Sequence, residues 1–352
     1  SLDQMGEDDN TSKISNDNGI LEAQVDLNNY TPIKELSVGY VSIKLIEDNK
    51  TKEQYCAKTF PSDFDMNYDT FIQTFNITTL FSFQHPTIES IIGFSLVDFS
   101  GKNSPTFIKP FFPNGSLGKL FRSTEIALDN TQRQCIIAGI AKGMSIIHQH
   151  GLIHSALTPE NILLDENYHP VISDFFYQNI QNVRTNSCIY QPPENQESND
   201  KTPKMDIYSF SMVIFQLITG HEPFDHLPNK IRKKTFALLN KISKDKERPK
   251  FPNDVEIPES LKTLMIQCWA VNPDDRPSFE DIYVKVTNFK DPQMACLNGI
   301  DVDKYKQYIE SIQDEPINLD ASTRVPTEPK VFERKPDLLS DSSDHNLTES
   351  FN

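Results

Sequence analysis

The hydrophobic period of this sequence changes once, at the Pro-Asn-Gly-Ser run of residues 113–116. Before this run, apolar and polar residues alternate, as at Val41, Ile43 and Leu45, which is typical of a strand with one buried face. Turn-forming residues at 48–51 indicate that the chain reverses there. The segments expected before the change are a hairpin with strands around 41–45 and 55–60, a helix at 68–83, and short strands near 88–98 and 105–112.

After the run, apolar residues recur at helical spacing in two long segments, around 136–147 and 207–217. Asp206 is expected to cap the second of these helices, and Gly220 lies just past its end. Further helices are expected at 258–271 and 278–288, and one short helix at 301–314.

This order of elements predicts an α+β domain with two lobes over residues 29–290. The small lobe, residues 29–112, is β-rich, and the larger lobe, residues 117–290, is α-helical. The flanking segments are expected to be a disordered acidic arm at 1–28, a short helical extension at 291–314 and a disordered acidic tail at 315–352.

The formal net charge of −16 makes nucleic acid a poor candidate partner, because a nucleic-acid surface is itself anionic. The sequence contains no run of 18 apolar residues that would indicate a membrane span, and residues 1–28 do not resemble a signal peptide. We therefore expect protein partners rather than a membrane or nucleic acid. Because the first residue, Ser1, is not a methionine, we expect the sequence to be part of a longer chain.

The five cysteines are odd in number and scattered, and no two of them form a Cys-x-x-Cys pair. This usage is typical of a reducing compartment and gives no sign of a disulfide framework or a zinc site. We therefore expect a cytoplasmic, intracellular protein.

Six short motifs carry a family resemblance, because they occur together in a fixed order and spacing. They are residues 148–154 (HQHGLIH), 157–164 (LTPENILL), 174–176 (DFF), 192–194 (PPE), 206–210 (DIYSF) and 268–279 (CWAVNPDDRPSF). This set resembles the protein kinase domain over about residues 30–290, and the last two motifs are most similar to the tyrosine-kinase-like group.

The resemblance implies a bilobal fold that uses ATP and Mg²⁺. Protein kinases position the phosphates with a lysine and hold the metal with an aspartate and an asparagine. The residues that the resemblance implies for nucleotide binding are Lys58, Ala57, Leu163 and the Phe112 amide, and those for magnesium are Asn161 and Asp174.

The catalytic loop departs from the family pattern at three positions within four residues. Ala156 stands where an active kinase has the aspartate that accepts the substrate proton, and losing such a base lowers the rate by roughly 10²–10⁴. Ser155 replaces the arginine that receives an activation-loop phosphate, and Thr158 replaces the lysine that steadies the transferred group. Asn76 falls at the place of the glutamate that pairs with Lys58.

The glycine-rich loop is also missing. Leu36, Val38 and Val41 fall at the three glycine positions, and a shift of one residue recovers only Gly39. Residues with a Cβ keep the backbone away from phosphate.

Lys109 falls at the gatekeeper position, where an ammonium group would be buried unless it finds an acid or a ligand. The favoured interpretation is that its stem packs while its charged end reaches solvent. The alternative is that Lys109 pairs with Asp174 and fills the site.

The residues that support the fold in the family are kept. His154 and Phe175, with Leu80, fall at the positions of a hydrophobic stack, and Glu194 and Arg276 match a buried ion pair of the large lobe. The sequence therefore favours a pseudokinase that acts as a binding, scaffold or allosteric module. The alternatives are a weakly active ATP-dependent protein kinase, which uses Lys58 and the two metal ligands without the base, and an inert domain of a longer protein.

Overall fold

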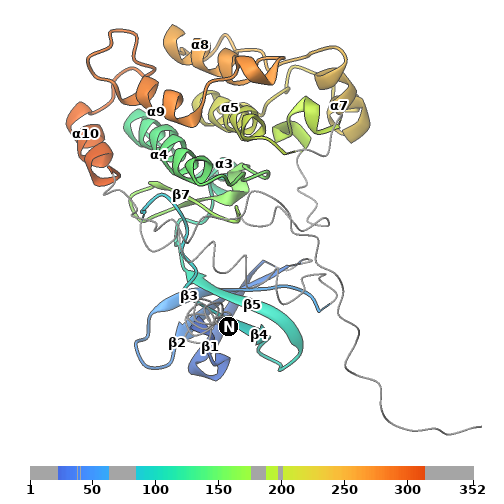
Figure 1. Ribbon diagram of the computed structural model, residues 1–352, viewed down its shortest axis with the longest axis vertical. Helices are drawn as coiled ribbons and strands as arrows, with labels where there is room; N and C mark the ends of the chain where they lie inside the picture. The colour runs from blue at the N-terminus through green and yellow to red at the C-terminus, as the bar shows by residue number, and fades with distance from the viewer. Residues whose placement is uncertain are drawn as a thin grey trace, which may run out of the picture. The chain divides into compact units, whose positions relative to one another are not determined.

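The computed structural model describes residues 23–37, 39, 41–62, 85–175, 188–196 and 201–313 (Figure 1). The chain has the bilobal α+β fold of protein kinases, with an antiparallel sheet in the small lobe and helices in the large lobe. Among the described residues, no helix is both long and apolar enough to cross a membrane.

The small lobe is built on one antiparallel sheet with the strand order β1-β2-β3-β5-β4. Its strands are β1 (Tyr30–Ser37), β2 (Ser42–Asp48), β3 (Gln54–Thr59), β4 (Gly93–Val97) and β5 (Asn103–Pro110). The predicted hairpin is confirmed as β2 and β3. Its turn is closed by Asp48, whose carboxylate accepts hydrogen bonds from the amides of Lys50 and Thr51 at 2.7 and 2.9 Å.

The two faces of this sheet carry different residues, because successive side chains of a strand point to opposite sides. Ala57 is paired with Ile108 and lies with Ile46 and Leu27 in a small apolar cluster on one face. Its two neighbours on β3, Cys56 and Lys58, therefore belong to the other face.

The large lobe is helical, with one short two-stranded sheet. Its helices are α3 (Leu117–Phe121), α4 (Asn130–Gln149), α5 (Pro203–Thr219), α6 (Asn229–Arg232), α7 (Thr235–Ser243), α8 (Glu259–Cys268), α9 (Phe279–Thr287) and α10 (Val302–Ser311). Its strands are β6 (Ile162–Leu164) and β7 (Pro170–Ile172). The helices expected around 136–147, 207–217, 258–271 and 278–288 are confirmed as α4, α5, α8 and α9.

Helix α4 lies at the centre of the large lobe and packs against β7, α9 and α10. It begins with a capping box, in which Asp129 accepts from the Gln132 amide at 2.7 Å and Gln132 accepts from the Asp129 amide at 3.0 Å. A Cβ added at Gly139 would lie 2.5 Å from Pro170 Cγ, so glycine is required there for the close approach of β7.

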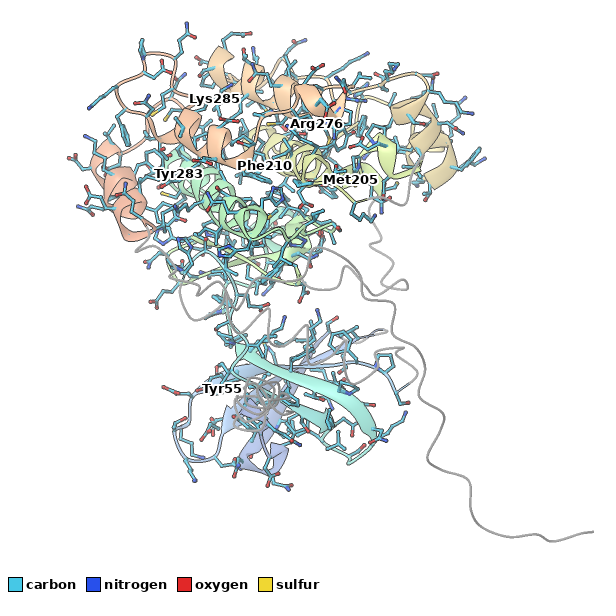
Figure 2. The ribbon with its side chains drawn as sticks, in the orientation of Figure 1. Tyr55, Met205, Phe210, Arg276, Tyr283 and Lys285 are labelled. Atoms are coloured by element: carbon cyan, nitrogen blue, oxygen red, sulfur yellow. The ribbon has the colours of Figure 1, made fainter. Side chains whose placement is uncertain are left out.

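Helix α5 is almost entirely buried, and its aromatic residues belong to the core of the lobe. Figure 2 labels Phe210 of this helix. Phe210 packs edge-to-face against Phe279 of α9, with the ring centroids 5.4 Å apart. Gly220 ends the helix with a φ of 73°, as the sequence predicts. The prediction that Asp206 caps α5 is wrong, because the helix begins at Pro203 and Asp206 lies inside it, fully buried.

The flanks of the domain are more ordered than expected. Residues 23–28 were assigned to a disordered arm, yet the Val25 amide donates to the Phe94 carbonyl at 2.8 Å and Leu27 is buried. Beyond α9, the Gln134 side chain of α4 holds the chain at Ala295 and Leu297, and α10 then packs on α4. Residues 314–352, which include the expected acidic tail, lie outside the described residues.

Candidate functional site

The catalytic loop is fixed to helix α5 by the buried carboxylate of Asp206. This carboxylate accepts hydrogen bonds from the backbone amides of His154 and Ser155 at 2.7 and 2.8 Å. It also lies 2.9 Å from His148 Nε2 of α4. Ser155 is held at a φ of 62°, an unfavourable value for a residue with a side chain. The loop is therefore positioned by the fold itself.

Ala156 lies in this anchored loop, half-buried, and its methyl group offers no proton acceptor. Its carbonyl oxygen accepts a hydrogen bond from Asn161 Nδ2 at 2.8 Å. Asn161 thus ties the loop together, and its amide oxygen is the side-chain atom left to bind another group.

Asp174 is held by two lysines from the small lobe. Lys58 Nζ of β3 lies 2.6 Å from Asp174 Oδ2, and Lys109 Nζ of β5 lies 2.8 Å from Asp174 Oδ1. Lys109 Nζ also lies 2.7 Å from Glu89 Oε2. The four side chains form a continuous chain of ion pairs between residues of both lobes, in which two positive charges face two negative charges.

Lys109 does not reach solvent. Its side chain is 4% exposed, as is that of Glu89, so the favoured expectation for Lys109 was wrong and the pairing with Asp174 is correct. The physical reason is that Glu89 and Asp174 supply two carboxylates inside the fold, which removes the need for the ammonium group to find water.

The electrostatics of the network follow from burial and from these pairs. Burial alone would raise the pKa of Asp174, but the ammonium groups of Lys109 and Lys58 hold it well below its usual range. Burial would likewise lower the pKa of Lys109, and the charges of Asp174 and Glu89 instead raise it. Burial raises the pKa of Glu89 despite the opposing charge of Lys109.

Glu89 is not among the site residues predicted from the sequence. It precedes β4 and lies in a mostly buried stretch that also contains Ile88, Ile91 and Ile92. A lone acid in one buried segment and a lone base in a neighbouring strand, Lys109, are a signal that the two groups pair.

Of the expected adenine-binding residues, Ala57 does not share the face of the sheet that carries Lys58. The assignment of Ala57 was wrong, because its methyl group lies on the face of the sheet opposite Lys58, in the cluster with Ile46. Cys56, directly opposite Lys109 in the β3–β5 register, lies on the face of the sheet that carries Lys58.

Leu163 and Phe112 lie in the segments that join the lobes. Leu163 is half-buried on β6 and forms an isolated bridge with Ser116. The Phe112 carbonyl accepts from the Gly115 amide at 2.9 Å and closes a turn there. The use of Leu163 and the Phe112 amide by adenine stays a prediction.

The glycine-loop region is described only in part. Leu36 is 40% exposed on β1, Gly39 is exposed, and Val41 is half-buried against the main core. The remaining positions discussed for this lobe, Val38, Asn76 and Leu80, lie outside the described residues.

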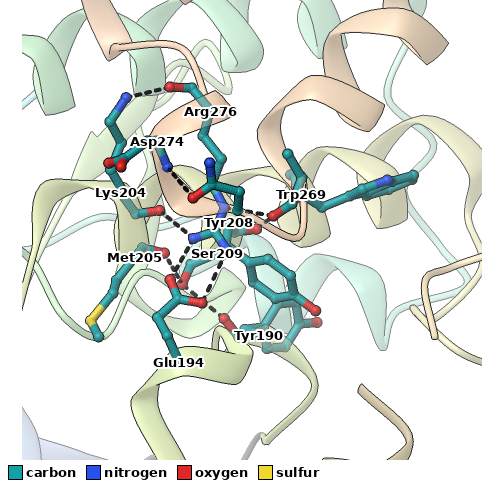
Figure 3. A network of polar contacts seen from close by, with 12 residues as sticks. Tyr190, Glu194, Lys204, Met205, Tyr208, Ser209, Trp269, Asp274 and Arg276 are labelled. Carbon is teal, nitrogen blue, oxygen red and sulfur yellow. Dashed lines mark hydrogen bonds and ion pairs between the residues drawn. The ribbon is translucent and has the colours of Figure 1, made fainter. Parts of the chain in front are cut away.

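The ion pair of the large lobe is present and buried (Figure 3). Arg276 Nη2 donates to Glu194 Oε2 at 3.0 Å, and a second bond joins the same two groups. The Arg276 side chain is 0% exposed, and it also donates to the carbonyls of Ala270 and Lys204 at 3.1 and 2.9 Å. The guanidinium lies over the Tyr208 ring, 5.3 Å from its centroid. The sequence-based pairing of Glu194 with Arg276 is therefore seen in the structure.

These features agree with the comparison to known families. The protein kinase domain family matches residues 34–286, and the chain belongs to that family.

Several curated kinases are similar to this chain. A probable serine/threonine-protein kinase of Dictyostelium discoideum is 29% identical over 280 residues, which cover 74% of this chain and 20% of that protein. The dual specificity protein kinase pyk3 of the same organism is 28% identical over 242 residues, 66% of this chain and 17% of that protein. A serine/threonine-protein kinase of Rattus norvegicus is 29% identical over 245 residues, 66% of this chain and 28% of that protein. The chain thus spans less than a third of the length of each of these relatives.

Proposed function

We propose that this domain is a pseudokinase of the tyrosine-kinase-like group that acts by binding protein partners rather than by phosphoryl transfer. The observation that carries the proposal is Ala156. The surrounding loop has its anchors, through Asp206, His154 and Asn161, yet the position that should accept the substrate proton has a methyl group. A kinase site that is only misaligned could regain activity through a conformational change. This site instead lacks the side chain that would accept the substrate proton.

The buried frame of the large lobe supports a binding role. Arg276 and Glu194 are kept as a fully formed pair, although a buried pair that loses one member destabilises a fold by about 3–5 kcal/mol. A large lobe that keeps its buried ion pair while its catalytic loop is altered fits a domain that acts by binding other proteins at its surface. The odd number and scattered positions of the five cysteines are the basis for a proposed reducing, cytoplasmic environment.

The second candidate is a weakly active kinase that transfers the γ-phosphoryl group of ATP to a protein hydroxyl, releasing ADP. Lys58, Asn161 and Asp174 favour it, as do relatives that are named as serine/threonine or dual specificity kinases. A loose transition state tolerates the loss of a base better than an associative one does.

The test is transfer of label from γ-labelled ATP to the full chain and to a generic protein substrate. The wild-type chain is expected to give no more signal than the Lys58→Met/Asp174→Ala double variant. A wild-type signal that disappears in the double variant would establish the kinase instead. A signal that is equal in both would point to a contaminating kinase and would leave the pseudokinase proposal standing.

A further inference from the structure

The family resemblance implies a divalent cation at Asp174 and Asn161, and the residues around Asp174 do not fit one. Magnesium binds oxygen ligands at about 2.0–2.1 Å in nearly octahedral geometry. Both oxygens of Asp174 already accept from ammonium groups, Oδ2 from Lys58 at 2.6 Å and Oδ1 from Lys109 at 2.8 Å. A doubly charged ion on either oxygen would meet an ammonium group on that same oxygen.

Lys109 is not free to move aside. Its ammonium group is held on the opposite side by Glu89 at 2.7 Å, and the side chains of both residues are 4% exposed. A cation that displaced Lys109 from Asp174 would leave a buried ammonium beside a new double charge, which electrostatics disfavour.

Within the part of the chain that the structure describes, the charges of this network are balanced without a metal. Lys58 and Lys109 supply two positive charges, and Asp174 and Glu89 supply two negative ones. An aspartate and an asparagine without nearby lysines would form a negatively charged site that attracts a divalent cation. Here the Lys109 ammonium occupies the position next to Asp174 instead.

We propose that the Lys109 ammonium substitutes for the divalent cation at Asp174, and that the Glu89–Lys109 pair closes a cation site that the chain still contains. The inference rests on the pseudokinase proposal and deepens it, because it states how the same site differs from a metal-dependent one. Wild-type Asp174 therefore serves as the counter-ion of two lysines and does not bind a metal.

The latent site consists of Asp174 and Asn161. The backbone amide and the hydroxyl of Ser173 both donate hydrogen bonds to the Asn161 carbonyl, at 2.9 and 3.2 Å. Ser173 directly precedes Asp174, so these hydrogen bonds link the segment of Asp174 to Asn161. The Asn161 amide oxygen remains to act as a ligand, since its nitrogen is used by Ala156. A carboxylate and an amide oxygen are ligands that hard divalent cations prefer.

The experiment replaces the pair as a unit, so that no buried charge is left alone. The Glu89→Leu/Lys109→Met variant keeps similar volumes, and such an exchange of a buried ion pair for apolar residues is often neutral for folding. Mn²⁺ is titrated into the full chain and followed by its electron paramagnetic resonance signal. The variants compared are the wild type, the double variant, and each of these with Asp174→Asn added.

The double variant is expected to bind one more Mn²⁺ than the wild type, and the added Asp174→Asn change is expected to abolish that extra site. In the wild-type background, Asp174→Asn is expected to leave Mn²⁺ binding unchanged, because other acidic groups account for all of it. The comparison of the wild type with Asp174→Asn does not require the Glu89→Leu/Lys109→Met variant to fold. Circular dichroism checks separately that this double variant is folded. Wild-type Mn²⁺ binding that depends on Asp174 would overturn the inference, as would a folded double variant without the extra site.

The outcome is separable from that of the proposed function. Phosphoryl transfer by a wild-type chain whose Mn²⁺ binding ignores Asp174 would overturn the pseudokinase and leave the substitution by Lys109 standing. A chain that transfers no phosphate yet binds Mn²⁺ through Asp174 would give the reverse result.

Discussion

His85 and Ile312 are 227 positions apart in the sequence, and a hydrogen bond of 3.1 Å joins His85 Nε2 to the Ile312 carbonyl. His85 precedes β4 of the small lobe, and Ile312 follows the last turn of α10. Helix α10 therefore does more than cover α4, because its end also holds the segment that leads into the small lobe. The extension after residue 290 is therefore an integral structural part of the domain.

The first prediction concerns Tyr308, which anchors α10. Tyr308 is 5% exposed and stacks on His169 with the ring centroids 4.2 Å apart. Tyr308→Ala should lower the free energy of unfolding by about 3–5 kcal/mol, because it removes a large buried ring. Tyr308→Phe is the matched control: the hydroxyl has no hydrogen-bond partner within the described part of the chain, so its loss should change little. Urea denaturation of both variants checks this, and equal losses would contradict it.

The second prediction compares two arginine–carboxylate pairs that differ in burial. Arg276→Met should destabilise the domain by about 3–5 kcal/mol, because it leaves Glu194 without its buried partner. Arg122→Met removes a pair with Glu160 of 2.8 Å, but the Arg122 side chain is 65% exposed, and the expected loss is below about 1 kcal/mol. Thermal unfolding of the two variants should rank them in this order, and a similar effect for both would show that burial does not decide it.

The third prediction is a double-mutant cycle on Glu89 and Lys109. Lys109→Met alone should destabilise by about 3–5 kcal/mol, since it leaves the buried Glu89 carboxylate without its lysine partner. Adding Glu89→Leu should recover most of that loss, which makes the two changes strongly non-additive. Additive losses in chemical denaturation would indicate that the two groups do not depend on one another.

The Lys109→Met variant should also show a distinctive pH dependence. Burial raises the pKa of Glu89, and removing Lys109 takes away the charge that opposes this rise. A carboxyl group whose folded pKa exceeds its unfolded value binds a proton on folding. Its contribution to stability is therefore fully present below the unfolded pKa, about 4.3, and is lost as the pH rises through the folded pKa. The stability gap between Lys109→Met and the wild type should widen with rising pH in denaturation measurements, and a gap independent of pH would contradict the assignment.

The fourth prediction concerns the anchor of the catalytic loop. Asp206→Asn keeps the size of the side chain but turns one acceptor into a donor that faces an amide of His154 or Ser155. A buried donor without an acceptor costs about 1–3 kcal/mol, and the variant should be less stable by that amount. Amide hydrogen exchange should also become faster at these two positions. Unchanged exchange there would show that another group holds the loop.

Patterns of local origin were predicted well. The hairpin of β2 and β3 and the helices α4, α5, α8 and α9 follow from hydrophobic period and turn residues, which are properties of neighbouring positions. Gly220 was recognised for the same reason, since a left-handed residue at a helix end is a local requirement. The pair of Glu194 and Arg276 could be predicted only through the family resemblance, because their 82 positions of separation leave no local signal.

The errors have identifiable physical causes. Ala57 was expected beside Lys58 at the nucleotide site, although neighbouring side chains of a strand point to opposite faces. The nearest residue of β3 on the same face as Lys58 is Cys56. Asp206 resembled a helix cap, but three donors inside the fold compete for its carboxylate. Lys109 was expected to reach water, because its partners Glu89 and Asp174 come from segments that only the folded chain brings together.

The placement of Cys56 gives the domain a native chemical reporter. This thiol lies on the same face of the sheet as Lys58 and Lys109, and burial together with the Glu89 charge raises its pKa to about 11. Since only the thiolate reacts readily, alkylation of Cys56 at neutral pH should be slow while the thiol stays buried beside Glu89. Mass-spectrometric mapping of its labelling rate would report any rearrangement that exposes this face of the sheet, without an engineered probe.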